Sequence, residues 1–315
     1  PKNTWTWVDF ADSACDDGTP TGIAINRSDS KNLLVFLMGG GACWDYLTCG
    51  ILNTSSHGPF GSKQWEGSKG ITQGSVLDRS AENPFRDYNM VFVPYCTGDI
   101  HAGDNVIEYD GGIGKKKVFH KGRPNLVAFL KRIAATLPEP EKLVVSGSSA
   151  GGFGAALSYD LFRTYFPTAK QSYMIDDSGP PMIGDAIPKD LRATIWKSWK
   201  FDQTIAPLCL GCSQDMSALV PVLAKKYGND RMSLLSYTQD GVIRNFFGLQ
   251  SGPDFEKNLR AVVEKVLEPQ PNFRYYVVTG DKHTFLGSPG KTTAQGIPLW
   301  DFLKKQVEDD PSWQS

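Results

Sequence analysis

Short runs of apolar residues alternate along the chain with longer segments whose apolar positions recur every three or four residues. The short runs predict strands that are buried on both faces of a sheet. Turn-forming residues such as Gly, Ser, Thr and Asp follow most of these runs and mark their ends. Strands are predicted over residues 33–38, 89–95, 142–146, 171–176, 232–237 and 273–278.

Helices are predicted between these strands. One begins near Pro124, which suits a first helical turn, and ends at Pro138, which cannot continue a helix. Others follow residue 150 and cover residues 255–266 and 297–307. Because strands and helices alternate, we expect a doubly wound α/β fold, in which helices cover both faces of a mainly parallel sheet.

The chain shows no linker rich in Ser, Gly or Pro, so we expect one domain over residues 1–315. Two long segments, at about 41–84 and 179–230, are expected to be insertions that shape a site. The 32 glycines and 20 prolines agree with long, shaped loops on a compact scaffold, where binding and catalytic residues usually lie.

The composition excludes several classes of protein. Of the 315 residues, 40% are hydrophobic and 21% are charged, as in soluble globular proteins. The net charge of −1 provides no positive field that would recruit nucleic acid or anionic lipid. The longest apolar run, residues 33–38, is too short to span a bilayer. We therefore expect no nucleic-acid partner and no membrane span, and we expect a monomer.

The cysteines and the start of the chain predict an exported protein. Six cysteines are an even number, which fits disulfides formed in an oxidising compartment. The chain begins at Pro1 without a Met or an apolar leader, so we expect a mature or trimmed product that is secreted or periplasmic. Six unpaired thiols in a cytosolic enzyme are the alternative.

The segment Gly147-Ser148-Ser149-Ala150-Gly151 lies between a predicted strand and a predicted helix. In that context G-x-S-x-G is a nucleophile elbow, in which flanking glycines allow a tight turn that presents the serine hydroxyl above the sheet. Ser149 is therefore the predicted nucleophile. The same pattern also occurs by chance in loops rich in Gly and Ser.

A serine hydroxyl needs a neighbouring base to remove its proton, and the chain has four histidines. In the chain order of α/β-hydrolases the catalytic histidine follows the last strand. His283 alone satisfies that order, since His57, His101 and His120 all precede the elbow. A surface or helix-capping role is the alternative for His283.

The acid that orients this base is expected between the elbow and His283, at the carboxyl end of a strand. Asp240, which follows the strand predicted at 232–237, fits best. Asp176 and Asp177 are the second choice, although aspartates in such a position commonly cap a turn.

Backbone N–H groups must stabilise the oxyanion that forms when a serine attacks an ester. The residue after the nucleophile, Ala150, supplies one of these donors. The glycine-rich turn after the first predicted strand supplies the others, and Gly40 and Gly41 are the candidates.

These features together resemble the pectin acetylesterase family, which includes polysaccharide deacetylases and the animal Notum carboxylesterases. The resemblance rests on ordered motifs between about residues 30 and 285. It implies an α/β-hydrolase-like serine esterase with Ser149, Asp240 and His283 as its triad, and without a cofactor or metal. The similar segments are residues 37–43 with Cys49, 83–85, 88–89, 93–99, 146–152, 176–179, 237–240 and 275–283.

The chain departs from the family at positions that bear on the substrate. Met38 replaces a Glu before the glycines, and Ala42 stands where plant members have Trp, with Trp44 two positions on. Ala42, Trp44 and Asp99 are the candidate pocket residues. With a net charge of −1, the chain also lacks the overall positive field that would help it bind polygalacturonate.

The resemblance also suggests how the cysteines pair. Cys43 and Cys49 resemble a family cystine. The Cys209-Leu-Gly-Cys212 segment forms either a local disulfide or half of a zinc site. Cys15 and Cys96 are then left to pair with each other.

The sequence therefore predicts a secreted serine carboxylesterase. Its expected substrate is a small-molecule or polysaccharide ester, such as an acetylated polysaccharide, from which it removes acetyl or other short acyl groups. Two alternatives remain open. One is a non-catalytic ligand-binding protein on a hydrolase scaffold, and the other is a peptidase, because triad chemistry alone does not separate esters from amides.

Overall fold

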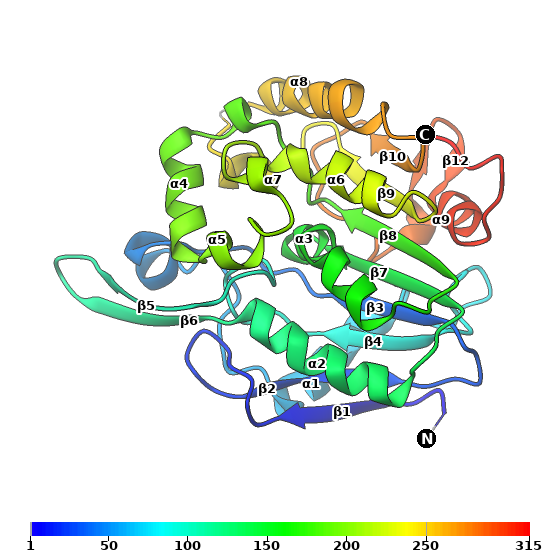
Figure 1. Cartoon of the computed structure of the whole chain (residues 1–315), viewed down its shortest axis with the longest axis horizontal. Helices are drawn as coiled ribbons and strands as arrows, with labels where there is room; N and C mark the ends of the chain where they lie inside the picture. The colour runs from blue at the N-terminus through cyan, green and yellow to red at the C-terminus, as the bar shows by residue number, and fades with distance from the viewer. Residues whose placement is uncertain (1, 250) are drawn as a thin grey trace.

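The computed structural model describes residues 2–249 and 251–315, in which an eight-stranded sheet forms the centre of the molecule (Figure 1). All six predicted strands belong to this sheet, and β1 and β2 extend it at one edge. In order across the sheet the strands are β1 (Trp5–Phe10), β2 (Thr21–Asn26), β4 (Asn89–Val93), β3 (Leu33–Leu37), β7 (Lys142–Ser148), β8 (Gln171–Asp177), β9 (Arg231–Tyr237) and β10 (Phe273–Val278).

The predicted helices are also present, with some changes at their ends. The helix predicted over 297–307 begins two residues later, because Ile297–Pro298 pairs with Thr293–Ala294 as the short strands β12 and β11. The α-helices are α1 (Ser62–Ser68), α2 (Gly122–Thr136), α3 (Ala150–Tyr165), α4 (Lys189–Ser198), α5 (Phe201–Thr204), α6 (Leu219–Lys226), α7 (Ile243–Phe246), α8 (Gly252–Val262) and α9 (Leu299–Val307).

The sheet is parallel from β4 to β10 and antiparallel at its other edge, where β1 and β2 lie. The sequence pattern did not predict β1 or β2. Strand β1 carries polar residues, and β2 contains Gly22, where a Cβ would lie 2.1 Å from the carbonyl oxygen of Val8. A glycine and polar residues lower strand propensity, so these two strands depend on their neighbours in the sheet.

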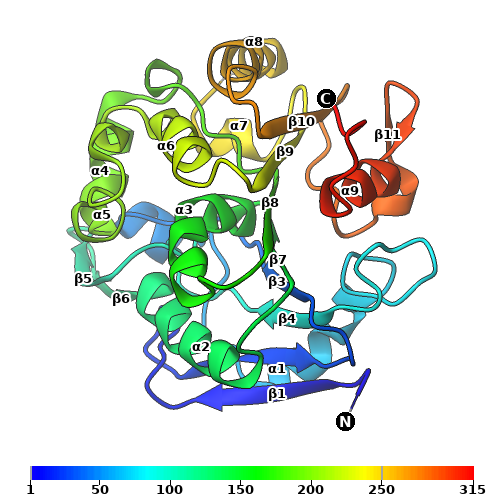
Figure 2. The same ribbon diagram turned by 45° about the vertical axis from the view of Figure 1, so that its right-hand side comes forward.

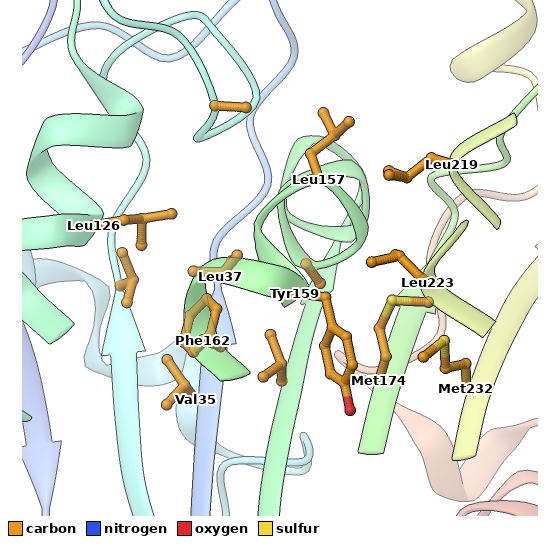
Figure 3. Packing of buried hydrophobic residues seen from close by; sticks show 14 of the residues in the cluster. Val35, Leu37, Leu126, Leu157, Tyr159, Phe162, Met174, Leu219, Leu223 and Met232 are labelled. Atoms are coloured by element: carbon orange, nitrogen blue, oxygen red, sulfur yellow. The ribbon is translucent and has the colours of Figure 1, made fainter. Parts of the chain in front are cut away.

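Two hydrophobic cores cover the two faces of the sheet. Side chains alternate across a strand, so Val35 and Leu37 of β3 enter one core while Leu34 and Phe36 enter the other. Helices α2, α3 and α6 cover the first face, and α9 lies on the opposite side (Figure 2). Figure 3 shows Phe162 of α3 packed beside Val35 and Leu37.

The two predicted insertions have structure of their own. The segment 41–84 contains α1, and the segment 179–230 contains α4, α5 and α6. Of these, α6 belongs to the helical layer over the sheet, because Leu219 and Leu223 are buried in its core (Figure 3). Helices α4 and α5 lie beyond the carboxyl ends of the strands (Figure 1).

A β-hairpin that the sequence did not predict projects from the molecule near α4 and α5 (Figure 1). Its strands are β5 (Asn105–Asp110) and β6 (Lys115–His120). His120 is the last residue of β6. Three consecutive lysines in β6 gave no apolar pattern from which a strand could be predicted.

All six cysteines form disulfides, in the pairs that the sequence analysis suggested. Because Cys209 and Cys212 are bonded to each other, they do not form half of a zinc site. The pairs are Cys15–Cys96, Cys43–Cys49 and Cys209–Cys212. Separately, none of the helices in the described residues is long and apolar enough to cross a membrane.

Candidate active site

Ser149 lies at a sharp turn between the end of β7 and the start of α3. Its backbone has φ 60° and ψ −122°, a strained conformation for a residue other than glycine. The turn needs its glycines, because a Cβ on Gly151 would lie 1.9 Å from the carbonyl oxygen of Leu37. A Cβ on Gly147 would lie 2.3 Å from the carbonyl oxygen of Gly151. This is the geometry of a nucleophile elbow.

Asp240 follows the carboxyl end of β9 and His283 follows the carboxyl end of β10, and their side chains come together there. The Nδ1 atom of His283 lies 2.7 Å from Oδ2 of Asp240, which is completely buried. The other carboxylate oxygen accepts hydrogen bonds from the backbone N–H groups of Val242 and Ile243, at 2.9 and 3.0 Å. A carboxylate accepts only, so Nδ1 carries a proton and leaves Nε2 free to accept one from a hydroxyl.

Asp176 and Asp177, the second-choice acids, accept hydrogen bonds from backbone N–H groups. Asp176 accepts the backbone N–H of Gly179 at 2.8 Å, and burial raises its pKa well above the ordinary value. Asp177 accepts the backbone N–H groups of Phe285 and Leu286. Among the described residues, neither of these carboxylates forms a hydrogen bond with the His283 ring. Asp240 is therefore the acid that the structure brings to His283.

The other three histidines have structural partners. His120 donates to the carbonyl of Thr97 and accepts from the Tyr109 hydroxyl, each at 2.9 Å. His101 donates from Nε2 to the Met38 carbonyl at 2.8 Å. Burial lowers the pKa of both rings to about 4. The remaining ring, that of His57, pairs with Asp16.

The predicted oxyanion residues form a glycine turn, residues 39–42, which packs directly against the nucleophile. A Cβ on Gly39 would lie 3.0 Å from the Ser149 Cβ. Gly40 and Gly41 both have positive φ, and a Cβ on Gly41 would lie 2.0 Å from the Thr54 carbonyl oxygen. Within the described residues, the N–H groups of Gly40, Gly41 and Ala150 have no hydrogen-bond acceptor. They are free to bind an oxyanion.

A pocket opens beside Ser149 between the glycine turn, α3 and the segment 180–216. It holds about 970 Å³ of space that atoms do not fill, part of which is open to solvent. We call it the apolar pocket, because Arg192 is the one charged residue among the described residues that line it. Its lining is otherwise mostly aromatic and aliphatic, and includes Trp44, Phe153, Leu157, Met182, Ile187, Ile195, Trp196, Trp199, Phe201, Met216, Phe246 and Phe247.

Two of the three candidate pocket residues line this pocket, namely Ala42 and Trp44. Asp99 does not line the pocket and is completely buried. Its carboxylate accepts the Thr97 hydroxyl and the backbone N–H of Gly122, at the start of α2. Desolvation raises the pKa of Asp99 to about 7. The structure gives Asp99 a role in the fold, where the sequence analysis had expected contact with substrate.

One group of potential metal ligands occurs in the described residues, namely Cys43, Cys49 and His120. The two sulfurs are bonded to each other, and only a thiolate is an effective ligand. The Nδ1 and Nε2 atoms of His120 both have protein partners. The chemistry of this group therefore does not fit a metal ion.

Comparison with known proteins places this geometry in a family. The family model described as Pectinacetylesterase matches residues 4–188, which is more than half of the chain. The chain belongs to the pectinacetylesterase family. The resemblance inferred from the motifs is thereby confirmed.

Curated relatives of this pectinacetylesterase-family chain carry two kinds of name. "Palmitoleoyl-protein carboxylesterase notum2" of Xenopus laevis is 30% identical over 148 residues, which is 46% of this chain and 29% of that protein. "Pectin acetylesterase 5" of Arabidopsis thaliana is 22% identical over 217 residues, or 66% of this chain and 49% of that protein. The matched segments thus span less than a third of the Notum relative and about half of the plant relative.

A solved structure confirms the fold class of this family member. The structure of the Wnt deacylase Notum from Drosophila matches with a TM-score of 0.69 and 17% sequence identity. The match covers 97% of this chain and 93% of the Drosophila chain. At that level of identity the comparison establishes the α/β-hydrolase-like fold alone.

The family match and the site geometry support different residues. The matched range contains Ser149 and the glycine turn, but it ends before Asp240 and His283. For these two residues the support is the hydrogen bond between their side chains. The insertion at 179–230 was expected to shape the site, but its individual pocket residues, such as Trp196, were not named, because no local sequence pattern marks them as pocket residues.

Proposed function

We propose that the protein is a serine carboxylesterase that hydrolyses acyl esters with Ser149, His283 and Asp240. The observation that carries this proposal is the hydrogen bond between the buried Asp240 and His283. These two residues follow β9 and β10, which lie on the same side of β7, the strand that ends at the Ser149 elbow. A binding protein without catalytic activity would have no need of an acid–base pair at that position, nor of a strained serine.

The chemistry follows from the positions of these groups. Ser149 Oγ attacks the acyl carbon while His283 Nε2 takes its proton, and Asp240 stabilises the imidazolium that forms. The N–H groups of Gly40, Gly41 and Ala150 bind the oxyanion of the tetrahedral intermediate. His283 then protonates the leaving alcohol, which gives an acyl-enzyme on Ser149. Water, activated by the same histidine, releases the carboxylic acid.

The apolar pocket supports an acyl chain longer than acetyl. The sequence analysis expected acetyl or another short acyl group, which needs only a small space beside Ser149. The pocket here is lined by residues of the glycine turn, α3, the segment 180–216 and α7, which offer more apolar surface than an acetyl group can contact. Its aromatic and aliphatic lining suits a hydrocarbon chain. The relatives' names include both a palmitoleoyl-protein carboxylesterase and a pectin acetylesterase.

We further propose that the protein acts outside the cytosol. Three disulfides agree with folding in an oxidising compartment, where such bonds form and persist.

The test is hydrolysis of p-nitrophenyl acetate, butyrate and octanoate by the wild type and by Ser149→Ala. We expect Ser149→Ala to lose at least about a thousandfold in kcat on every ester. We also expect kcat/KM of the wild type to rise from acetate to octanoate, because each CH₂ buried contributes about 0.8 kcal/mol. Equal activity of the two proteins would exclude this mechanism, and a preference for acetate would exclude a longer acyl chain.

Asp240→Asn tests the acid, and Asp281→Asn is its matched control. Asp281 is an exposed carboxylate two residues before His283 and bonds to the neighbouring loop through its backbone carbonyl. We expect kcat to fall on the order of 10⁴-fold in Asp240→Asn, since an amide favours the wrong tautomer of His283. Asp281→Asn should keep nearly all of the activity. The same loss in both variants would show that Asp240 is not the catalytic acid.

A further inference from the structure

Asp177, at the carboxyl end of β8, is a completely buried carboxylate that the proposed chemistry does not use. Burying an ionised carboxylate is costly unless several donors compensate for the lost water. Four groups donate to Asp177. The Ser148 hydroxyl lies 2.6 Å away, the Ser178 hydroxyl 3.1 Å, the Phe285 N–H 3.0 Å and the Leu286 N–H 2.9 Å.

These donors belong to the two halves of the active site. Ser148 immediately precedes the nucleophile, whose own N–H donates to the Asp177 carbonyl at 2.7 Å. Phe285 and Leu286 end the histidine loop, residues 279–286, which follows β10. One residue thus contacts the elbow on β7 and the histidine loop beyond β10. It does so from β8, which lies between them in the sheet.

The residue after Asp177 strengthens the same connection. Ser178 Oγ accepts the N–H of Thr284, the residue next to His283, at 3.2 Å. Ser149, Ser178 and Thr284 all have φ near 60°, which side-chain-bearing residues seldom adopt. Strained residues persist only where surrounding contacts hold them. Here Ser149 bonds to the Asp177 carbonyl, Ser178 to the Asp177 carboxylate and Thr284 to the Ser178 hydroxyl.

We propose that Asp177 is a positioning residue, which holds the histidine loop at the correct distance from the Ser149 elbow. The inference rests on the proposed function, because it assigns a role to a neighbour of the proposed triad. Asp240 sets the orientation of the His283 ring, and Asp177 sets the place of the backbone that carries the ring. Reaction between Ser149 and His283 then depends on a residue that touches neither substrate nor base.

A purely structural role for Asp177 is the competing explanation, and Asp176 offers a matched control for it. Asp176 precedes Asp177 on the same strand and is just as buried, and its carboxylate accepts the N–H of Gly179. It has no hydrogen bond to the described residues of the histidine loop. Asp176→Asn and Asp177→Asn therefore make the same chemical change at neighbouring buried positions, but only the second alters the connection between the two loops.

The experiment measures kcat and KM on p-nitrophenyl butyrate, with active sites counted by a fluorophosphonate that labels Ser149. Counting sites removes the contribution of unfolded protein. We expect Asp177→Asn to lower kcat per site by about 10- to 100-fold with little change in KM, because displaced reacting groups slow chemistry more than binding. Phosphonylation of Ser149 should slow by a similar factor. Asp176→Asn should keep kcat per site within about twofold of the wild type.

Ser178→Ala is the second variant, for the case in which Asp177→Asn does not fold. It removes the acceptor for Thr284 N–H and one donor to Asp177, and we expect a several-fold lower kcat per site at unchanged KM. Wild-type kcat per site in Ser178→Ala and in any folded Asp177→Asn would overturn the inference, as would an equal loss in Asp176→Asn. If the wild type itself hydrolyses no ester, the proposed function fails instead.

Discussion

His101 shows how a single buried side chain links the site to the stability of the protein. Its ring packs against that of Tyr95 at a tilt of 39°, with the ring centroids 4.8 Å apart, and it donates to the carbonyl of Met38, just before the glycine turn. Only 3% of the residue is exposed. Desolvation favours the neutral ring and lowers the pKa from 6.5 to about 4. His101 therefore supports the turn as a neutral donor.

We predict that His101→Phe changes how stability depends on pH. Between pH 6.5 and 4 the unfolded wild type binds a proton at His101 that the folded protein does not, so acid weakens the wild type. Phe cannot titrate. At pH 7 the variant should be less stable by about 1 kcal/mol, since the Met38 carbonyl loses its donor.

The free energy of unfolding of the wild type minus that of the variant should fall as the pH falls from 6.5 to 4, by at most about 1.4 kcal/mol per pH unit, and should change sign within that range. Urea unfolding of both proteins at pH 7, 6, 5 and 4.5 measures it. Other titrating groups are common to the two proteins and cancel in the difference. A value of wild type minus variant that stays constant or becomes more positive on acidification would contradict the prediction.

The residues of the candidate site differ in how well sequence could predict them. Ser149 lies in a motif whose glycines follow from steric contacts, and His283 follows from chain order. Asp240 was preferred over Asp177 by order alone, and the structure separates the two by their hydrogen-bond partners. Trp196 and Phe246 could not be predicted, because they reach the pocket through tertiary packing and carry no local pattern.

At the scale of elements, the glycine turn after β3 is held from several sides. Cys43, which follows the turn, donates its N–H to the Gly98 carbonyl at 2.9 Å. Its own carbonyl accepts the indole N–H of Trp199 at 2.9 Å. The disulfide to Cys49 closes the next loop. The turn that is proposed to bind the oxyanion is therefore fixed by covalent and hydrogen bonds.

We predict that removing the Cys43–Cys49 disulfide lowers kcat more than removing the Cys15–Cys96 disulfide does. It should lower the free energy of unfolding less. The Cys43–Cys49 bond spans 6 residues and Cys15–Cys96 spans 81. Loop entropy then gives stabilisations of about 2 and 4.5 kcal/mol. Cys43→Ser/Cys49→Ser should lower kcat several-fold, because the oxyanion donors become less ordered.

The matched control is Cys15→Ser/Cys96→Ser, in which the thiols removed do not border the glycine turn. Urea unfolding gives the stabilities, and p-nitrophenyl butyrate hydrolysis below the unfolding transition gives kcat. A lower kcat in the control than in Cys43→Ser/Cys49→Ser would contradict the proposed role of this disulfide.

For the whole molecule, the sequence predicted the parallel part of the sheet and the helices beside it. Strands β3, β4, β7, β8 and β9 are almost entirely buried, and the edge strand β10 is half-buried, but all six carry apolar runs that are visible in the sequence. Strands β1 and β2 and the β5–β6 hairpin are stabilised by pairing and carry polar residues or glycine. Their apolar content alone did not reveal them, because neighbouring strands determine whether such segments pair.

The position of β10 has a consequence for how the protein loses activity. In the described sheet Ser149 follows a central strand, but His283 follows β10, which pairs with β9 alone. Edge segments open by local unfolding at lower free energy than the centre of a fold. We predict that esterase activity in urea is lost at a lower concentration than far-ultraviolet circular dichroism, whereas coincident transitions would contradict this. Activity would then report the integrity of one edge strand, and a partly opened protein could keep its nucleophile while losing its base.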